Sequence, residues 1–162
     1  MYLKCLDGIT DFIETRKILE GKKLVVKLYK ELNLFLVKYN KEKCDMTDPD
    51  VIKSRGLILE KDTNKLVCIP PLKSVLVDKL DNYDIDELSF EEFPDGTMIN
   101  VFKYNNSLHI STRSNIGASC KWYSSKSFKV LFNESITEDE LNKLNNIDEG
   151  LSLSFVLQHP EN

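Results

Sequence analysis

Apolar residues recur in short runs along this chain, and the runs predict strands that come in pairs. Three runs rich in Leu, Ile, Val and Phe lie at 34–39, 56–60 and 66–69. Asp62-Thr63-Asn64 stands between the last two runs and predicts the turn of a hairpin. Pro70-Pro71 ends this hairpin, because proline has no N–H to donate to a strand ladder.

A second hairpin is predicted from 98–104 and 108–112, which are joined across Asn105-Asn106. Apolar and polar residues alternate clearly in both segments, so their apolar side chains can share one face of a sheet. Pro94-Asp95-Gly96 predicts a tight turn before this hairpin. The run at 151–157 predicts a final strand.

Three segments have the periodicity or the capping residues of helices. The first is 8–19, capped by Thr10 or Asp11, with Ile9, Phe12, Ile13 and Ile18 roughly on one side. The second is 121–131, with Trp122, Tyr123 and Phe128 on its apolar side. The third is 138–145, where Thr137 and Glu140 form a capping box.

Two further segments are less regular. Residues 24–29 fit either a strand or a continuation of the first helix, and 41–50 is polar and predicts a loop. Hairpins mixed with separated helices predict an α+β domain, built mainly on antiparallel sheet with flanking helices. We divide the chain into a helical and strand lead-in at 1–33 and a domain at 34–162.

Composition and charge narrow the class of protein. Of the 162 residues, 41% are hydrophobic and 30% are charged, as in globular proteins rather than disordered ones. No apolar run approaches the ~20 residues of a membrane span, and the N-terminus has no apolar core of a secretion signal. We therefore expect an intracellular protein with no membrane partner.

The cysteines and histidines do not suggest a metal site. Cys5, Cys44, Cys68 and Cys120 are far apart and form no Cys-x-x-Cys pair, so we expect reduced thiols, with Cys68 packed in a strand. His109 falls in the alternating pattern of a strand, which favours a structural or surface role.

The net charge of −4 argues against a protein whose whole role is to coat nucleic acid. A local basic patch is still compatible with it, because lysines cluster in two places. Each cluster fits either solvated surface or a phosphate-binding patch. The clusters are Lys22, Lys23, Lys27 and Lys30, and Lys38, Lys41 and Lys43. The acidic stretch at 78–92 is expected to be exposed.

Three short motifs carry groups that suit phosphate chemistry. Ser54-Arg55-Gly56 opens a predicted strand, and arginine offers paired donors to a phosphate while glycine permits close backbone approach. Asp95-Gly96-Thr97 opens the second hairpin. Ser111-Thr112-Arg113-Ser114, followed by Gly117, ends it. Each motif alone fits an ordinary turn or strand end.

Their order along the chain resembles the N-terminal nucleotidyltransferase domain of the RNA ligase family typified by phage T4 RNA ligase 1. The segment 53–60 is similar to the family's Arg-Gly strand, and 68–74 to the segment after it. Phe93-Pro94-Asp95-Gly96 falls at the family's Lys-x-Asp-Gly motif. Leu153-Ser154-Phe155-Val156 falls at its aromatic-Glu-aromatic strand. The resemblance implies an ATP-grasp-like fold of RNA and DNA ligase adenylation type, in incomplete form.

The resemblance also implies a chemistry. Such enzymes attack the α-phosphate of ATP with a lysine, transfer the AMP to an RNA 5′-phosphate and then seal the RNA, with Mg²⁺. By resemblance, Arg55 and Gly56 would meet nucleotide phosphates or the RNA end, and Asp95 and Gly96 would shape the nucleotide pocket. Arg113 would lie near the ribose or phosphates.

Two departures from the family pattern affect catalysis. Phe93 stands at the nucleophile position, where it cannot form a lysyl-AMP. Ser154 stands at the acidic position, where it can hydrogen-bond a ribose or base but cannot hold a metal ion as a carboxylate would. The chain also stops at Asn162, before the family's later motifs. We therefore expect either part of a longer protein or an active site that was never whole.

Three hypotheses follow. The first is a catalytically degenerate domain that binds a nucleotide, an RNA end or a protein, of a kind associated with large DNA viruses. The second is an active RNA ligase with a relocated nucleophile, for which Lys103 and Lys73 are the candidates. The third is a scaffold or interaction module whose acidic 78–92 stretch meets a basic partner.

Overall fold

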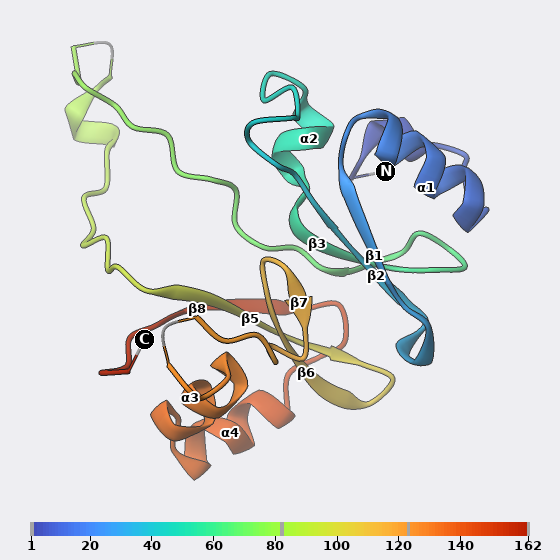
Figure 1. Cartoon of the computed structure of the whole chain (residues 1–162). Coiled ribbons are helices and arrows are strands. Elements are labelled where there is room, and N and C mark those ends of the chain that lie inside the picture. The colour runs from blue at the N-terminus through green and yellow to red at the C-terminus, as the bar shows by residue number, and fades with distance from the viewer. Residues whose placement is uncertain (1, 82, 123, 162) are drawn as a thin grey trace.

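The structure is an α+β fold with two four-stranded antiparallel sheets and a few helices (Figure 1). It is a computed structural model that describes residues 2–81, 83–122 and 124–161. The strand order is β1-β2-β3-β4 in the first sheet and β7-β6-β5-β8 in the second. Every described strand pair is antiparallel.

The first sheet is built by the N-terminal part of the chain. Its central strands are nearly continuous apolar runs, because both of their faces are covered. Phe35 and Leu57 pack beneath the N-terminal helices, while Leu36 and Ile58 point to the other face. The elements of this part are η1 (Lys4–Leu6), α1 (Phe12–Gly21), β1 (Val25–Tyr29), η2 (Lys30–Leu32), β2 (Leu34–Lys38), α2 (Pro49–Lys53), β3 (Arg55–Glu60) and β4 (Leu66–Cys68).

The second sheet has two unlike faces because side chains alternate along its strands. Ile99 and Val101 pack on the two C-terminal helices, whereas Asn100 and Phe102 face the other way. The elements of this part are β5 (Thr97–Tyr104), β6 (Ser107–Thr112), β7 (Asn115–Ile116), α3 (Phe128–Ser135), α4 (Glu138–Asn145) and β8 (Ser152–Leu157).

The two sheets meet through a shared apolar cluster. Leu34, Leu36 and Ile58 of the first sheet pack with Phe102 and Ile116 of the second. Hydrogen bonds fix the junction at its rim. The Ile116 N–H donates to the Tyr29 hydroxyl at 3.0 Å, and the Tyr104 hydroxyl donates to Glu60 at 2.9 Å.

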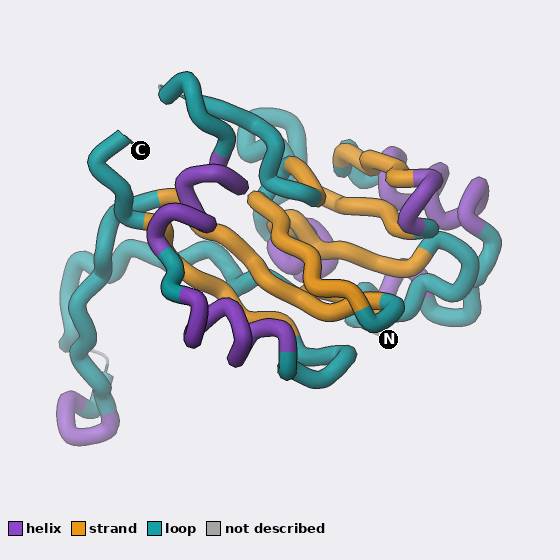
Figure 2. The backbone as a smooth tube through the Cα atoms, turned by 90° about the horizontal axis from the view of Figure 1, so that it is seen from below, coloured by secondary structure: helices purple, strands orange, loops and turns teal. Residues whose placement is uncertain are grey.

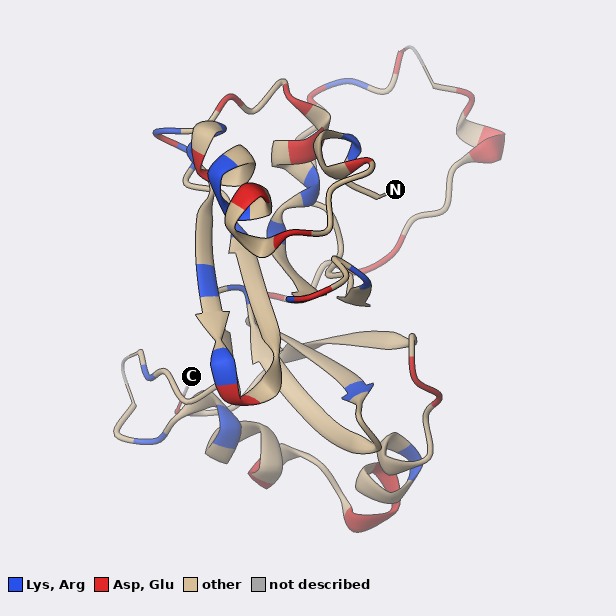
Figure 3. Cartoon of the chain, turned by 90° about the vertical axis from the view of Figure 1, so that its right-hand side faces the viewer, with Lys and Arg blue, Asp and Glu red and all other residues tan. Residues whose placement is uncertain are grey.

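Between β4 and β5 the chain runs as a long extended strap (residues 69–96), which includes η3 (Ile85–Glu87). Its described residues are almost all exposed, and Figure 2 shows it projecting from the body of the molecule. Acidic residues are prominent along it in Figure 3. The expectation that 78–92 is exposed is therefore confirmed for the described residues. The strap ends at Phe93–Gly96, against the second sheet.

Most predicted elements are present. Both hairpins, the final strand and the Thr137–Glu140 capping box are confirmed, and Asp11 is the residue that caps α1. Residues 25–29 are a strand, which settles the open choice at 24–29. Cys68 is buried in β4, all four cysteines are free thiols, and His109 lies in β6.

Three local predictions are wrong. Helix α3 begins at Phe128, not at 121, because Ser127 caps it, and Trp122 is 70% exposed rather than on an apolar face. The predicted place of Tyr123 lies outside the described residues. Ile13 of α1 is 78% exposed, although the periodicity of the first helix predicts that it is buried.

The other corrections are smaller. The predicted loop at 41–50 contains the start of α2, where Asp48 is the cap and Pro49 the first helical residue. Residues 94–96 form a bend at Gly96 instead of a closed turn. In the described part of the chain, no helix is long and apolar enough to cross a membrane.

Candidate functional site

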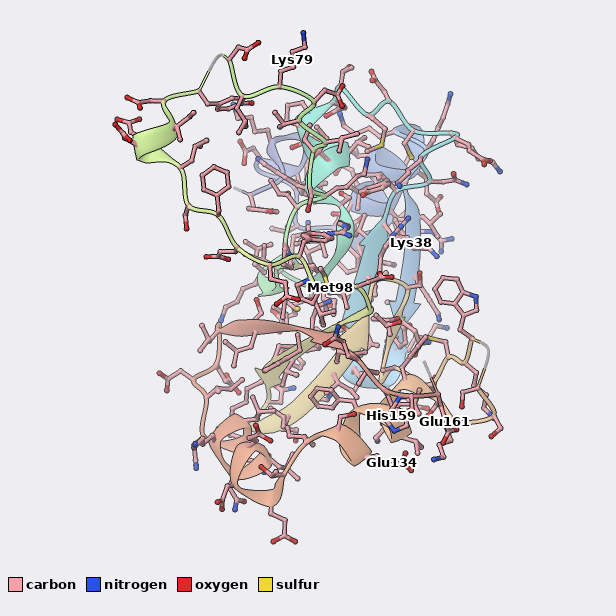
Figure 4. The ribbon with its side chains drawn as sticks, turned by 90° about the vertical axis from the view of Figure 1, so that its left-hand side faces the viewer. Lys38, Lys79, Met98, Glu134, His159 and Glu161 are labelled. Carbon is pink, nitrogen blue, oxygen red and sulfur yellow. The ribbon has the colours of Figure 1, made fainter. Side chains whose placement is uncertain are left out.

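A cleft of about 770 Å³ lies where the end of the strap meets both sheets. Its walls come from the first residue of β3, the end of the strap and the start of β5, and from the end of β6 with the loop after it. Residues 120–122, the first residue of α3 and one residue of β8 complete them. Met98, which lies between the two sheets in Figure 4, is part of the wall. The lining residues are Arg55, Phe93, Pro94, Asp95, Gly96, Thr97, Met98, Thr112, Arg113, Ser114, Cys120, Lys121, Trp122, Phe128 and Val156.

Five residues expected from the motifs are therefore together at one cleft. Arg55, Phe93, Asp95, Gly96 and Arg113 come from three separate parts of the sequence and all line it. The cleft is basic, since Arg55, Arg113 and Lys121 face a single acidic residue, Asp95, among its described lining residues. Such a surface attracts anions although the whole chain carries a net charge of −4.

Gly56 and Gly96 hold the walls of the cleft together by permitting close backbone contact. A Cβ on Gly56 would lie 2.9 Å from both the Cα and the carbonyl oxygen of Arg113. A Cβ on Gly96 would lie 2.4 Å from the Leu157 carbonyl oxygen. Both distances are too short for any side chain. Gly56 thus allows the loop after β6 to pack directly on β3, and Gly96 fixes the strap end against β8.

The Arg113 guanidinium is held on the inner side of the cleft by Tyr39. Its Nη2 donates to the Tyr39 carbonyl oxygen at 3.1 Å, and the guanidinium carbon lies 5.0 Å from the centre of the Tyr39 ring. Its Nε is buried and has no hydrogen-bond partner in the described part of the chain. A buried donor left in this way costs about 1–3 kcal/mol, so a hydrogen-bond acceptor that reached it would stabilise the side chain.

Arg55 connects the cleft to the beginning of the strap. Its Nη1 donates to the carbonyl oxygens of Pro71 and Leu72, at 3.3 and 3.2 Å. The segment before Arg55 is fixed as well, because the Ser54 hydroxyl donates to the Asp50 carbonyl oxygen at 2.8 Å. The Ser54 bond therefore fixes the backbone before Arg55, and the strap carbonyls hold its guanidinium. The Arg55 side chain is half-buried at the cleft.

Asp95 takes part in local contacts at the strap end. Its carboxylate accepts from the Gly96 N–H at 2.9 Å, and its carbonyl oxygen accepts from the Gln158 side chain at 3.1 Å. Phe93, two residues earlier, is 83% exposed on the rim of the cleft. A phenyl ring at this place offers a flat apolar face and no nucleophile.

A cluster of charges surrounds Lys126, which follows Lys121 and Trp122 in the segment before α3. The Lys126 ammonium lies 3.0 Å from Glu134 and 2.8 Å from Glu161, and His159 Nε2 lies 3.4 Å from Glu134. Figure 4 shows Glu134, His159 and Glu161 gathered together. Hydrogen bonds to Glu161 and Glu134 raise the pKa of Lys126. This cluster connects Lys126 to α3 and to the end of the described chain.

Ser154, Lys103 and Lys73 do not line the cleft. The Ser154 hydroxyl donates to Asn100 Oδ1 at 2.8 Å, in a polar row that continues to Ser111 across the sheet. Lys103 lies on the helix-covered face of β5, and its ammonium donates to the Asn145 carbonyl oxygen at 3.3 Å. Lys73 is exposed on the strap.

Three features of the site, and one buried polar row elsewhere in the second sheet, are not predicted by the sequence patterns. The periodicity places Lys121 and Trp122 in a helix, and Tyr39 in an ordinary strand. The polar row also escapes the patterns, although Asn100 and Ser111 are fully buried and Asn100 Nδ2 and Ser111 Oγ have no partner among the described residues. A polar residue on the inward face of a predicted strand is the signal that would have revealed the row.

The lysine clusters are separate from the cleft, with one point of contact. Among Lys38, Lys41 and Lys43, only Lys38 reaches a described lining residue, since its ammonium donates to the Ser114 hydroxyl at 3.0 Å. Lys22 instead pairs with Asp48 at 2.5 Å, and this contact raises its pKa. Lys22 therefore joins the end of α1 to the start of α2, because Asp48 is the cap of α2.

Comparison with known proteins gives a distant relative. The chain is 28% identical, over 136 residues, to a protein of Autographa californica nuclear polyhedrosis virus named "Putative bifunctional polynucleotide kinase/RNA ligase". The match covers 73% of this chain and 19% of that protein, so the chain spans about a fifth of its length. No family model and no solved structure matches the chain. The match shows that the chain is similar to a protein named as an RNA ligase, and it does not by itself place the chain in the RNA ligase family.

Proposed function

We propose that this chain has an RNA ligase-like nucleotidyltransferase fold, and that its cleft binds a phosphorylated RNA end or nucleotide without forming a lysyl-AMP. The observation that carries the proposal is the convergence of Arg55, Asp95, Gly96 and Arg113 on one basic cleft. The similarity to a protein named as a kinase and RNA ligase supports the nucleic-acid ligand.

The cationic groups of the cleft suit phosphate oxygens. Arginine forms paired, charge-assisted hydrogen bonds with phosphate, and Arg113 already has a buried N–H without a partner among the described residues. Arg55 reaches the same cleft from the other sheet, and Lys121 adds a third positive charge. These three side chains would hold the terminal phosphate of RNA or the phosphates of ATP.

The residues of the cleft fit the phosphates of ATP better than they fit Mg²⁺. Asp95 is the only carboxylate among its described lining residues, and it already accepts from Gly96. No group of three or more His, Cys, Asp or Glu side chains in the described part of the chain is arranged to hold a metal ion. We therefore assign no step to a protein-held Mg²⁺ here.

The side chains at the catalytic positions favour binding without covalent chemistry. Phe93 is on the cleft rim at the place of the expected nucleophile. The proposed substitutes Lys103 and Lys73 lie outside the lining, and an amine must be aimed within about an ångström of its target, since small misplacements cost ~100-fold in rate. Lys121 is the one lysine among the described lining residues, so it is the amine that a test must exclude.

The test has two arms. The chain is incubated with α-labelled ATP and Mg²⁺ or Mn²⁺ and then separated on a denaturing gel, beside a Lys121→Arg variant that keeps the charge. The same folded chain is titrated with RNA oligonucleotides bearing a 5′-phosphate. We expect no covalent label and saturable RNA binding. A labelled band that disappears in Lys121→Arg would overturn the non-catalytic proposal and identify a relocated nucleophile.

A further inference from the structure

Two exposed aromatic side chains line the basic cleft, and the phosphate contacts described above do not use them. Phe93 is 83% exposed and Trp122 is 70% exposed. They come from segments far apart in the sequence, the end of the strap and the loop before α3, yet both line the same cleft as Arg55, Arg113 and Lys121. Single exposed apolar residues are common on proteins and need no explanation. Two large rings on one basic cleft are a more specific arrangement.

Aromatic rings beside cationic groups are the combination that single-stranded nucleic acid requires. Its backbone needs positive charge, and its unpaired bases stack on flat aromatic faces whatever their sequence. A paired duplex presents stacked bases with no free face, so it would use the charges of this cleft and offer no base to either ring. A free inorganic phosphate would likewise leave the rings unused.

We propose that Phe93 and Trp122 are base-stacking residues that make the cleft specific for a single-stranded RNA end. This inference rests on the proposed function and names the part of the ligand that the arginines do not touch. Arg55 and Arg113 hold the 5′-phosphate, and the first unpaired bases stack on the two rings. Phe93 thereby contributes binding at the position where it cannot contribute a nucleophile.

The chain provides a direct spectroscopic readout for this inference. Trp122 is its only tryptophan, so the intrinsic tryptophan fluorescence comes from the cleft alone. A base stacked on an indole ring quenches its fluorescence. Titration with a 5′-phosphorylated RNA pentanucleotide is therefore expected to give saturable quenching. A ribose-phosphate oligomer of the same length and 5′-phosphate, but without bases, is expected to bind about tenfold more weakly and to give no quenching. Tenfold corresponds to about 1.4 kcal/mol, which lies in the range for stacking one base on an aromatic side chain.

Variants of the rings have a matched control on the strap. Phe90 is 70% exposed, three residues before Phe93, and it does not line the cleft. Phe93→Leu is expected to weaken pentanucleotide binding about tenfold, measured by fluorescence anisotropy of a labelled RNA, while Phe90→Leu leaves it unchanged. Trp122→Leu is expected to weaken binding to a similar extent. Circular dichroism of each variant confirms that it is folded.

The outcomes separate this inference from the proposed function. If neither oligomer binds the folded chain, the phosphate-binding function itself is wrong. If both oligomers bind equally and the Trp122 fluorescence does not change, the phosphate site stands and the stacking role is overturned. Equal weakening by Phe90→Leu and Phe93→Leu would also overturn it, because the effect would then belong to the strap rather than to the cleft.

Discussion

Gly56 lies against the backbone of Arg113, so closely that a Cβ on Gly56 would approach the Arg113 Cα and carbonyl oxygen to 2.9 Å. This contact joins the two sheets at the cleft. It brings Arg55, at the start of β3, next to the loop that presents Arg113. The arrangement of Arg55 and Arg113 therefore depends on glycine at position 56, which has no side chain to keep the two backbones apart.

Gly56→Ala is expected to destabilise the fold and to separate the two arginines. Gly56 has φ +93°, where an L side chain is strained by about 1–2 kcal/mol, and the clash with Arg113 adds about 1–3 kcal/mol. Urea unfolding measures the loss. Gly117→Ala is the matched control, because Gly117 has φ +91° but a Cβ added to it would meet no atom within 4 Å. Equal losses of unfolding free energy in the two variants would show that the methyl group added at position 56 does not clash with Arg113, which would contradict this account.

Asp50→Ala is expected to lower the free energy of unfolding by about 2–4 kcal/mol. Asp50 is buried in α2, and its two carboxylate oxygens accept from the N–H groups of Lys4 and Cys5, both at 2.9 Å. Burial alone would raise the pKa of Asp50, but these backbone donors hold it below its usual value. Removal of the carboxylate leaves both donors without an acceptor.

The control for Asp50 is Asp84→Ala, which removes an exposed carboxylate that accepts from Asp86 N–H on the strap. It is expected to cost less than about 1 kcal/mol. Thermal or urea unfolding of both variants makes the comparison. A loss at Asp50 no larger than the loss at Asp84 would contradict the role of Asp50 in anchoring the N-terminal segment.

His109→Phe is expected to reduce the acid sensitivity of the fold. Burial lowers the pKa of His109 below its ordinary value of 6.5. The unfolded chain therefore takes up the proton first, and stability falls as the pH drops below about 6.5 towards the folded pKa. Phenylalanine keeps a ring against Phe102, whose centroid lies 5.5 Å from that of His109, but it cannot titrate.

Unfolding curves of the wild type and His109→Phe are measured from about pH 7.5 to about pH 5, a range set by the ordinary histidine pKa of about 6.5. The stability difference between them should shift in favour of the variant as the pH falls. A constant difference across this range would show that His109 does not titrate differently in the folded chain. Carboxylates with lowered pKa, such as Asp50, affect stability only at more acidic pH.

The hairpins and the capped helices were predictable because their signals are local. Strand alternation over 98–112 and the Thr137 capping box depend on neighbouring residues alone. The helix predicted at 121–131 failed because Ser124, Ser125 and Ser127 favour caps and turns over a helix interior. Ser127 indeed caps α3, and residues 120–122 line the cleft instead.

The candidate site was predictable only in part, for a similar reason. The order of the Arg55, Asp95 and Arg113 motifs resembles that of the RNA ligase family, and this resemblance, rather than any single motif, placed them at one pocket; all three line the cleft. Lys121, Trp122 and the Tyr39 support of Arg113 depend on how the two sheets pack, which no local pattern records. Ser154 was expected at the nucleotide, yet its hydroxyl is turned towards Asn100.

The measurement that tests the central claim most directly compares RNA oligonucleotides with a 5′-phosphate and with a 5′-hydroxyl, titrated against the wild type, Arg113→Gln and Arg16→Gln. Arg16 is the matched control because it pairs with Glu20 on the exposed side of α1, away from the cleft. We predict that the wild type and Arg16→Gln prefer the 5′-phosphate by about 10- to 100-fold, the value of a charge-assisted hydrogen bond, and that this preference is clearly reduced in Arg113→Gln. Equal affinity of the wild type for both RNAs, or an undiminished preference in Arg113→Gln, would contradict a phosphate-binding cleft.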